Sequence, residues 1–318
     1  MKNAFCLWVF VLFLFAGCRP DNVKKSTTPT LPSTTPAAPT AALIASIPYT
    51  AHPVTIDGAL DEECWHAMPA ISGDYIHGKI NQLDPDPCLK VWYAWDDNYL
   101  YIAYETFDRN LVARTSGEKQ GPAGREREGC SIWVEGVKVD VVEFFISAES
   151  DMFFWEIHHN ALNQFNDVWC IALPAEHPLR SNTRFPHGIY FGNADFLADD
   201  PPYTVATAVK LKPRADGGLS TVNHETDEDS GYTAEIRIPW HAVGVPNERA
   251  TWVEKDDKAT GKKTNTPGPW RMEGQVLWLL GVVQDGDRSN RYHHTSPTFP
   301  GGWFHKGAIH YPRYVLRR

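Results

Sequence analysis

Beyond residue 42 the chain consists mainly of short runs of β-branched and aromatic residues, separated by turn-forming clusters. Such runs predict strands, and no long helical pattern lies between them. Helical spacing is confined to one or two turns after Asp57 and after Trp240. We therefore predict an all-β fold, an antiparallel β-sandwich of the jelly-roll type with long loop insertions. The predicted strands are Leu89–Trp95, Tyr99–Phe107, Cys130–Val134, Val139–Ser147, Met152–His158, Val168–Ala172, Tyr203–Leu211, Gly231–Pro239 and Val276–Gln284.

Two kinds of connection are expected between these strands. Asp96-Asp97-Asn98 predicts a tight hairpin, because Asp and Asn tolerate the left-handed backbone conformation of such turns. The stretches from Pro174 to Pro202 and from Glu248 to Pro269 predict long loops. Loops of this length are commonly functional or disordered.

The N-terminus has the outline of a signal peptide, with Lys2, an apolar run over residues 4–15 and a small pair before Cys18. The run is too short for a membrane-spanning helix, which needs about 20 apolar residues. Phe15-Ala16-Gly17-Cys18 resembles a lipobox, which implies removal of residues 1–17 and lipidation of Cys18. An ordinary secretory signal with an incidental Cys18 is the alternative.

Residues 18–42 are rich in Pro, Thr, Ser and Ala and contain almost no large apolar side chain. They cannot bury enough surface to offset their ordering entropy, so we predict a disordered tether. Residues 43–318 then form one domain. We expect an exported, membrane-anchored lipoprotein, held by its lipid at the periplasmic face or the cell surface.

Charge and cysteine content limit the partners. A formal net charge of -9 argues against nucleic acid, whose phosphates need a basic surface. After the signal peptide and Cys18 come Cys64, Cys88, Cys130 and Cys170, which permit two disulfides in an oxidising compartment, with three pairings open. None of them forms a Cys-x-x-Cys pair, which disfavours zinc, redox and covalent haem sites.

Four segments, in order along the chain, carry a family resemblance: Pro53–Trp65 with Ile56-Asp57-Gly58, Lys90–Ala103 around Asp96-Asp97-Asn98, Asp140–Ile146 with Glu143, and Tyr232–Trp240 with Glu235. They resemble the motifs of family 9 carbohydrate-binding modules (CBM9) and their DOMON-like relatives. The resemblance implies a non-catalytic sandwich that binds poly- or oligosaccharide, in a glycan-capture or carbohydrate-catabolic context. Glu143 falls on the family's strand glutamate, which contacts sugar hydroxyls.

The sugar site departs from the family pattern at its stacking positions. Val137 and Thr295 stand where the family has tryptophans whose rings stack on the sugar. Nearby side chains are candidates to replace them or to add polar contacts: Trp133, Trp155, Trp169, Trp303, Asn160 and His294.

Catalysis is not expected, because Asp140 and Glu143 are three residues apart on a strand and face opposite ways. A glycosidase needs two carboxyl groups about 5–9.5 Å apart across the sugar bond. Glu156 and His158 share a strand face, whereas His159 takes the other, so the adjacent histidines make a poor metal site.

His293-His294 has the same defect as a metal ligand pair. No cofactor is predicted, apart from a structural calcium ion that Asp285, Asp287 and the acidic run Glu225–Asp229 could hold through oxygen ligands. Solvated loop charge is the simpler interpretation of these residues.

Two other functions stay open. A DOMON-like electron-transfer domain would hold haem b between His or Met ligands, and Met68, Met152 and Met272 are the methionines available, with Met152 and a histidine as the conceivable pair. A structural or adhesion lipoprotein that meets a protein partner is the second alternative.

Overall fold

The computed structural model describes residues 43–113, 139–148, 153–171, 189–191, 205–224, 226–243, 249–257, 262–299, 301, 304 and 308–318. They belong to one compact unit, Pro39–Arg318. Within these ranges no helix is long and apolar enough to cross a membrane. Several predictions concern residues outside the described ones: the signal peptide, Cys18, the tether, the strand Cys130–Val134, Trp133, Val137, Met152, Trp303 and the side chain of Trp169.

The described strands form two large sheets, and the predicted all-β sandwich is confirmed. The larger sheet has nine strands. Its main path is β1 (Leu43–Pro48), β16 (Arg313–Arg317), β14 (Val276–Gln284), β6 (Val141–Ser147), β7 (Phe153–His159), β8 (Phe165–Ile171) and β9 (Ile189–Phe191). Beside β14 lie β15 (Tyr292–His294) and then β3 (Tyr75–Ile76).

The smaller sheet has five strands, of which β4 and β5 form the predicted hairpin around Asp96-Asp97-Asn98. Its order is β10 (Ala206–Leu211), β11 (Tyr232–Pro239), β5 (Tyr99–Thr106), β4 (Leu89–Trp95) and β2 (Ile71–Ser72). Pairing is antiparallel in the described ladders except between β1 and β16, which run parallel. The described ranges include the short 3-10 helices η1 (Glu63–His66), η4 (Trp240–Val243) and η7 (Ala308–His310).

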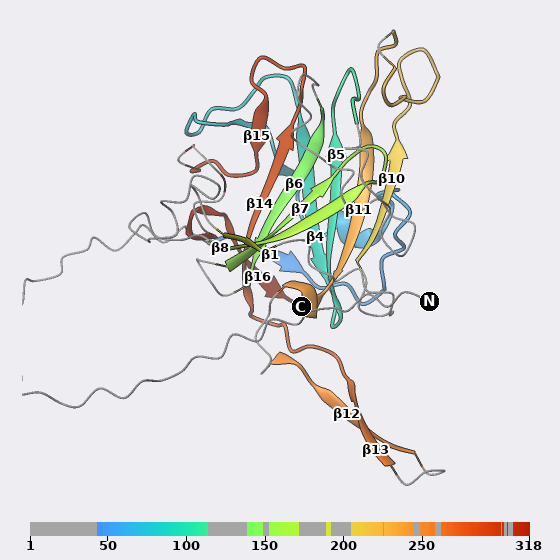
Figure 1. Cartoon of the computed structure of the whole chain (residues 1–318), viewed down its shortest axis with the longest axis vertical. Coiled ribbons are helices and arrows are strands. Elements are labelled where there is room, and N and C mark those ends of the chain that lie inside the picture. The colour runs from blue at the N-terminus through green and yellow to red at the C-terminus, as the bar shows by residue number, and fades with distance from the viewer. Residues whose placement is uncertain are drawn as a thin grey trace, which may run out of the picture. The chain divides into compact units, whose positions relative to one another are not determined.

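The main core lies between the two sheets. Val142 and Phe144 of β6 belong to it, and the ring of Phe144 lies 5.5 Å from that of Tyr104 on the smaller sheet, centroid to centroid. Because side chains alternate along a strand, Glu143 and Phe145 point the other way. We call this other side of the larger sheet, turned away from the smaller sheet, its outer face. Figure 1 shows β6, β7 and β14 side by side in this sheet.

A second apolar cluster covers part of the outer face. Its members are Phe145, Phe154, Cys170, Leu280, Val282, Phe299, Phe304, Ala308 and Tyr311. A third cluster, with Cys64, Trp65 and Tyr101, packs the N-terminal segment against the far side of the smaller sheet. The larger sheet is therefore buried on both faces over much of its area.

The predicted loop from Glu248 to Pro269 is wrong, because it contains a hairpin of β12 (Trp252–Asp257) and β13 (Lys262–Pro267) (Figure 1). Its sequence is mostly polar, and a two-stranded ribbon pairs through its backbone without the apolar alternation that predicts a sheet strand. In the other predicted loop, Pro174–Pro202, β9 is the part that the structure describes.

The two disulfides that the cysteine count permits are not formed. Two disulfides would use all four cysteines of the domain, but Cys64 and Cys88 are free thiols buried in different apolar clusters. Burial raises the pKa of Cys64 to about 12. The Cys170 thiol donates to the Glu156 carboxylate, with Sγ 3.4 Å from Oε2.

Candidate functional site

The first and last family-like segments meet at a buried carboxylate on the smaller sheet. Glu235 of β11 accepts backbone hydrogen bonds from Asp57 and Gly58 through Oε2, at 3.0 and 2.9 Å. Its Oε1 accepts the indole N–H of Trp65 at 3.0 Å. Gly58 has φ +82°, and a Cβ there would lie 2.7 Å from the carbonyl carbon of Val209. These residues hold the N-terminal turn on the sheet, so their role is structural.

Burial raises the pKa of Glu235 to about 7, and the nearby carboxylate of Glu62 acts in the same direction. The backbone donors of Asp57 and Gly58 oppose this shift. Glu235 is therefore partly protonated near neutral pH.

The hairpin segment is also structural. Asp96 Oδ1 accepts the backbone N–H groups of Asn98 and Tyr99, each at 2.7 Å, and Oδ2 accepts the Tyr101 hydroxyl at 2.6 Å. The indole of Trp240, which ends the last family-like segment, donates to the Asp96 carbonyl at 2.9 Å. Three of the four family-like segments therefore have structural roles. The fourth, on β6, is the one whose side chains remain as candidates for contact with a ligand.

The β6 segment places Glu143 in a polar row that crosses the outer face. Strand pairing sets Glu143 opposite His158 of β7 on one side and opposite Val282 of β14 on the other. Val282 in turn lies opposite His294 of β15. All three polar side chains of the row are buried: Glu143 is 3%, His158 7% and His294 1% exposed.

Glu143, Glu156 and His158 form a cluster, which we call the outer-face triad. One ligand atom from each lies within 4.8 Å of the others. The Nε2 atom of His158 is 2.8 Å from Oε1 of Glu156. The sequence placed Glu156 and His158 on one strand face, but not beside Glu143, because the register between β6 and β7 is absent from the sequence.

The other predicted sugar-contacting residues have mixed surroundings. His294 lies in the polar row, and burial together with His77 and His293 lowers its pKa to about 3. Asn160 follows β7, and its side-chain carbonyl accepts the N–H groups of Leu162 and Gln164 at 3.1 and 3.2 Å, which shapes the turn into β8.

Trp155 belongs to the main core and is 0% exposed, so its ring has no face open to solvent. Thr295 is 2% exposed, and its hydroxyl accepts the N–H of Gly281 at 3.0 Å. Neither side chain is placed to stack on a sugar.

Half-buried aromatic side chains lie beside the polar row, and the sequence did not indicate them. Tyr292 of β15 is close enough to Glu143 for the carboxylate to help burial raise its pKa. The ring of His77 lies 6.1 Å from Tyr292 and 5.9 Å from His294, and Tyr75 stacks on His294 at 6.4 Å. This end of the outer face therefore combines carboxylate, imidazole and phenol groups.

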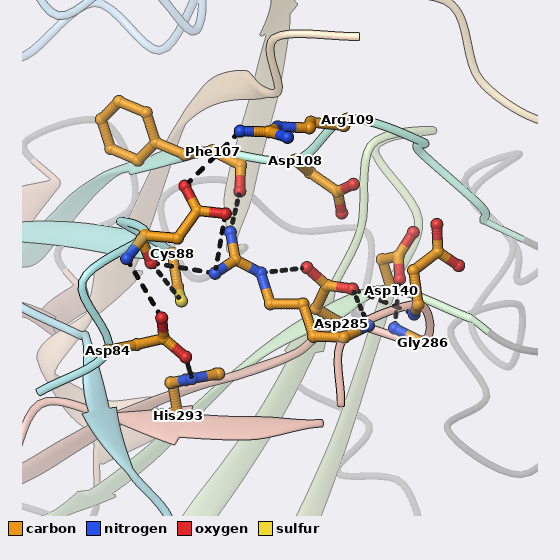
Figure 2. A network of polar contacts seen from close by, with 12 residues as sticks. Asp84, Cys88, Phe107, Asp108, Arg109, Asp140, Asp285, Gly286 and His293 are labelled. Atoms are coloured by element: carbon orange, nitrogen blue, oxygen red, sulfur yellow. Dashed lines mark hydrogen bonds and ion pairs between the residues drawn. The ribbon is translucent and has the colours of Figure 1, made fainter. Parts of the chain in front are cut away.

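A second cluster, of carboxylates alone, lies where β6 begins. Asp108, Asp140 and Asp285 each place one oxygen within 4.8 Å of the others (Figure 2). Both oxygens of Asp140 accept backbone N–H groups, from Val112 at 2.6 Å and from Gly286 at 2.7 Å.

Burial and the neighbouring carboxylates raise the pKa of Asp108 to about 7 and that of Asp140 to about 9. Asp285 also accepts the guanidinium of Arg288 at 2.6 Å. Arg288 then reaches the Asp86 and Pro87 carbonyls, each at 2.9 Å, and this network fastens the loops around the cluster (Figure 2).

The other residues considered for calcium are engaged elsewhere. Asp287 accepts the side-chain amide of Asn110, Asp227 pairs with Arg214, and Asp229 accepts the N–H of Leu111 and of Thr221. Of the methionines considered for haem, Met68 and Met272 are core residues.

No family model matches the chain, and a search of curated proteins finds no significant match. The chain is similar to solved structures at low identity. One is a CBM9 module from Caldicellulosiruptor kristjanssonii in complex with glucose, 18% identical, with a TM-score of 0.45 over 87% of this chain and 96% of that one. The module in complex with cellotriose is 16% identical, with a TM-score of 0.43 over 86% and 94%.

A third structure is described as a carbohydrate-binding protein from Bacteroides uniformis. It is 12% identical, with a TM-score of 0.49 over 87% of this chain and 100% of that one. These similarities concern the sandwich fold.

Proposed function

We propose that the chain is a non-catalytic carbohydrate-binding lipoprotein domain that binds poly- or oligosaccharide, in a glycan-capture or catabolic context. The observation that carries the proposal is the placement of Glu143 and His294 on the outer face, on either side of Val282, with Tyr292 two residues before His294 and within electrostatic reach of Glu143. Carboxylate and imidazole groups pair with sugar hydroxyls, and aromatic rings stack on the C–H face of a sugar.

The exposed fractions suggest how a glycan reaches this site. Tyr75, His77 and Tyr292 are half-buried, so a sugar can meet their rings first. Glu143 is 3% exposed, so a sugar that contacts its carboxylate must displace part of what covers it. We infer that the aromatic end of the row replaces the stacking positions lost at Val137 and Thr295.

The burial of the triad carboxylates favours binding over hydrolysis. Glu143 and Glu156 are each 3% exposed. The two catalytic carboxyl groups of a glycosidase need a sugar bond between them, and two carboxylates buried in one cluster leave no open space for it.

The test is a glycan array and affinity-gel screen of the full chain in detergent, comparing wild type with Tyr292→Ala, His77→Ala and Glu143→Gln. We expect each variant to weaken binding about tenfold or more. Tyr49→Ala is the matched control, because Tyr49 makes an edge-to-face contact with Trp95 away from the polar row. Absence of binding to every glycan, or binding that survives all three changes, would overturn the proposal, and a Soret band on the purified protein would favour the haem alternative.

Lipidation of Cys18 is proposed separately, as the anchor that displays the domain at a membrane. Radiolabelled palmitate should enter the wild-type chain and should not enter Cys18→Ser. Equal labelling of both chains would refute this anchor.

A further inference from the structure

The outer-face triad has the donor atoms and spacing of a metal site. Strand pairing puts Glu143 directly opposite His158, and Glu156 precedes His158 by two residues on the same face. Neighbouring strands and this two-residue step bring the three side chains together. Their ligand atoms lie within 4.8 Å of one another, and two of them are already 2.8 Å apart.

The donor set distinguishes between ions. An imidazole nitrogen with two carboxylate oxygens suits Zn²⁺, whereas Ca²⁺ takes six to eight oxygens. Zn²⁺ bonds of about 2.0–2.2 Å place tetrahedral ligand atoms about 3.3–3.6 Å apart, a spacing that lies within the 4.8 Å that encloses the ligand atoms of the triad.

The other acidic cluster differs in its donor atoms. Asp108, Asp140 and Asp285 offer oxygen only, without an imidazole nitrogen. We propose that Glu143, Glu156 and His158 bind one Zn²⁺ ion on the outer face, with the remaining coordination position left for water. This proposal goes beyond glycan binding and does not depend on it.

The test is calorimetric titration of the full wild-type chain in detergent with ZnCl₂, with no glycan present. We expect one bound ion per chain, and at least tenfold weaker binding for both His158→Gln and Glu156→Gln. His66→Gln and Glu228→Gln are matched controls at exposed positions and should bind Zn²⁺ as the wild type does. In a titration of the same proteins with CaCl₂, we expect either no Ca²⁺ binding or Ca²⁺ binding with an affinity that His158→Gln does not change.

A second measurement uses the wild-type protein alone, so it does not depend on whether a variant folds. Co²⁺ added to the wild type should give the visible d–d bands of a tetrahedral site, and Zn²⁺ should remove them. The proposal is overturned if the wild type binds no Zn²⁺, if folded His158→Gln retains wild-type affinity, or if Co²⁺ shows only the weak bands of the hydrated ion.

Discussion

Two buried glutamates on strands of this sandwich have opposite surroundings. Glu235 is 0% exposed, and its two oxygens accept three N–H groups from the N-terminal segment. Glu143 is 3% exposed and stands with a second carboxylate and an imidazole. Both belong to segments that resemble one family. The comparison teaches that most residues of a family-like motif can serve to hold the fold together. Glu235 does so here, whereas the candidate ligand-binding side chains lie on the larger sheet.

The largest effect should come from Glu235→Ala. The change leaves the N–H groups of Asp57 and Gly58 without their acceptor and removes one of the two acceptors of the Trp65 indole, which also donates to Glu62, so we expect the free energy of unfolding to fall by about 4 kcal/mol. Urea denaturation measures it. Glu228→Ala, at an exposed site, should change stability by less than about 0.5 kcal/mol. A small loss of stability in Glu235→Ala would contradict the structural role assigned to Glu235.

Gly58→Ala should cost about 3 kcal/mol, because it adds both backbone strain at φ +82° and a contact at 2.7 Å with Val209. Gly217→Ala is the matched control, since it has φ +89° but nothing within 4 Å of the new Cβ, and should cost about 1 kcal/mol. Thermal unfolding of the two variants separates strain from crowding. Equal losses of stability in the two variants would mean that the backbone around Val209 moves away from the new Cβ without a measurable cost.

Asp140→Asn should flatten the pH dependence of stability. The folded-state pKa of Asp140 is raised from 3.8 to about 9, so the folded protein binds the extra proton. Its stabilising contribution is full below pH 3.8 and is lost as pH rises toward about 9. Unfolding in urea at a series of pH values should show a shallower decline for Asp140→Asn than for wild type. Identical slopes would contradict the buried, protonated state of Asp140.

Glu143→Gln should have the smallest effect on folding, a change of less than about 1 kcal/mol in the free energy of unfolding. Gln keeps the shape of the side chain and its carbonyl acceptor, so the change costs little packing or hydrogen bonding. Urea denaturation of Glu143→Gln and Glu235→Gln measures the difference, and we expect Glu235→Gln to lose more stability. A loss of about 3 kcal/mol or more at Glu143 would mean that both glutamates serve the scaffold.

Much of the fold could be predicted because strand alternation and turn chemistry are local. β4 and β14 have the predicted bounds, and the Asp96-Asp97-Asn98 hairpin is confirmed. β1 and β16 were missed, because each is stabilised mainly by a partner at the other end of the chain. The polar hairpin of β12 and β13 gave no apolar signal.

The sequence indicated single side chains of the candidate site but not how they come together. Alternation puts Glu156 and His158 on one face of β7, whereas their position beside Glu143, and that of His294 on the same sheet face as Glu143, depend on strand register. Asp108, Asp140 and Asp285 come from three separate loops or strand ends, so no local pattern could unite them. Whether these side chains contact sugar stays a prediction.

The parallel pairing of β1 with β16 has a consequence for biosynthesis. The first strand of the domain lies at the sheet edge against the last one, so a chain made from its N-terminus holds β1 without that neighbour until Arg313–Arg317 is complete. A chain that is cut or terminated just before Arg313 therefore lacks the strand that pairs with β1, and the start of the domain keeps only its contacts with β4 and the core.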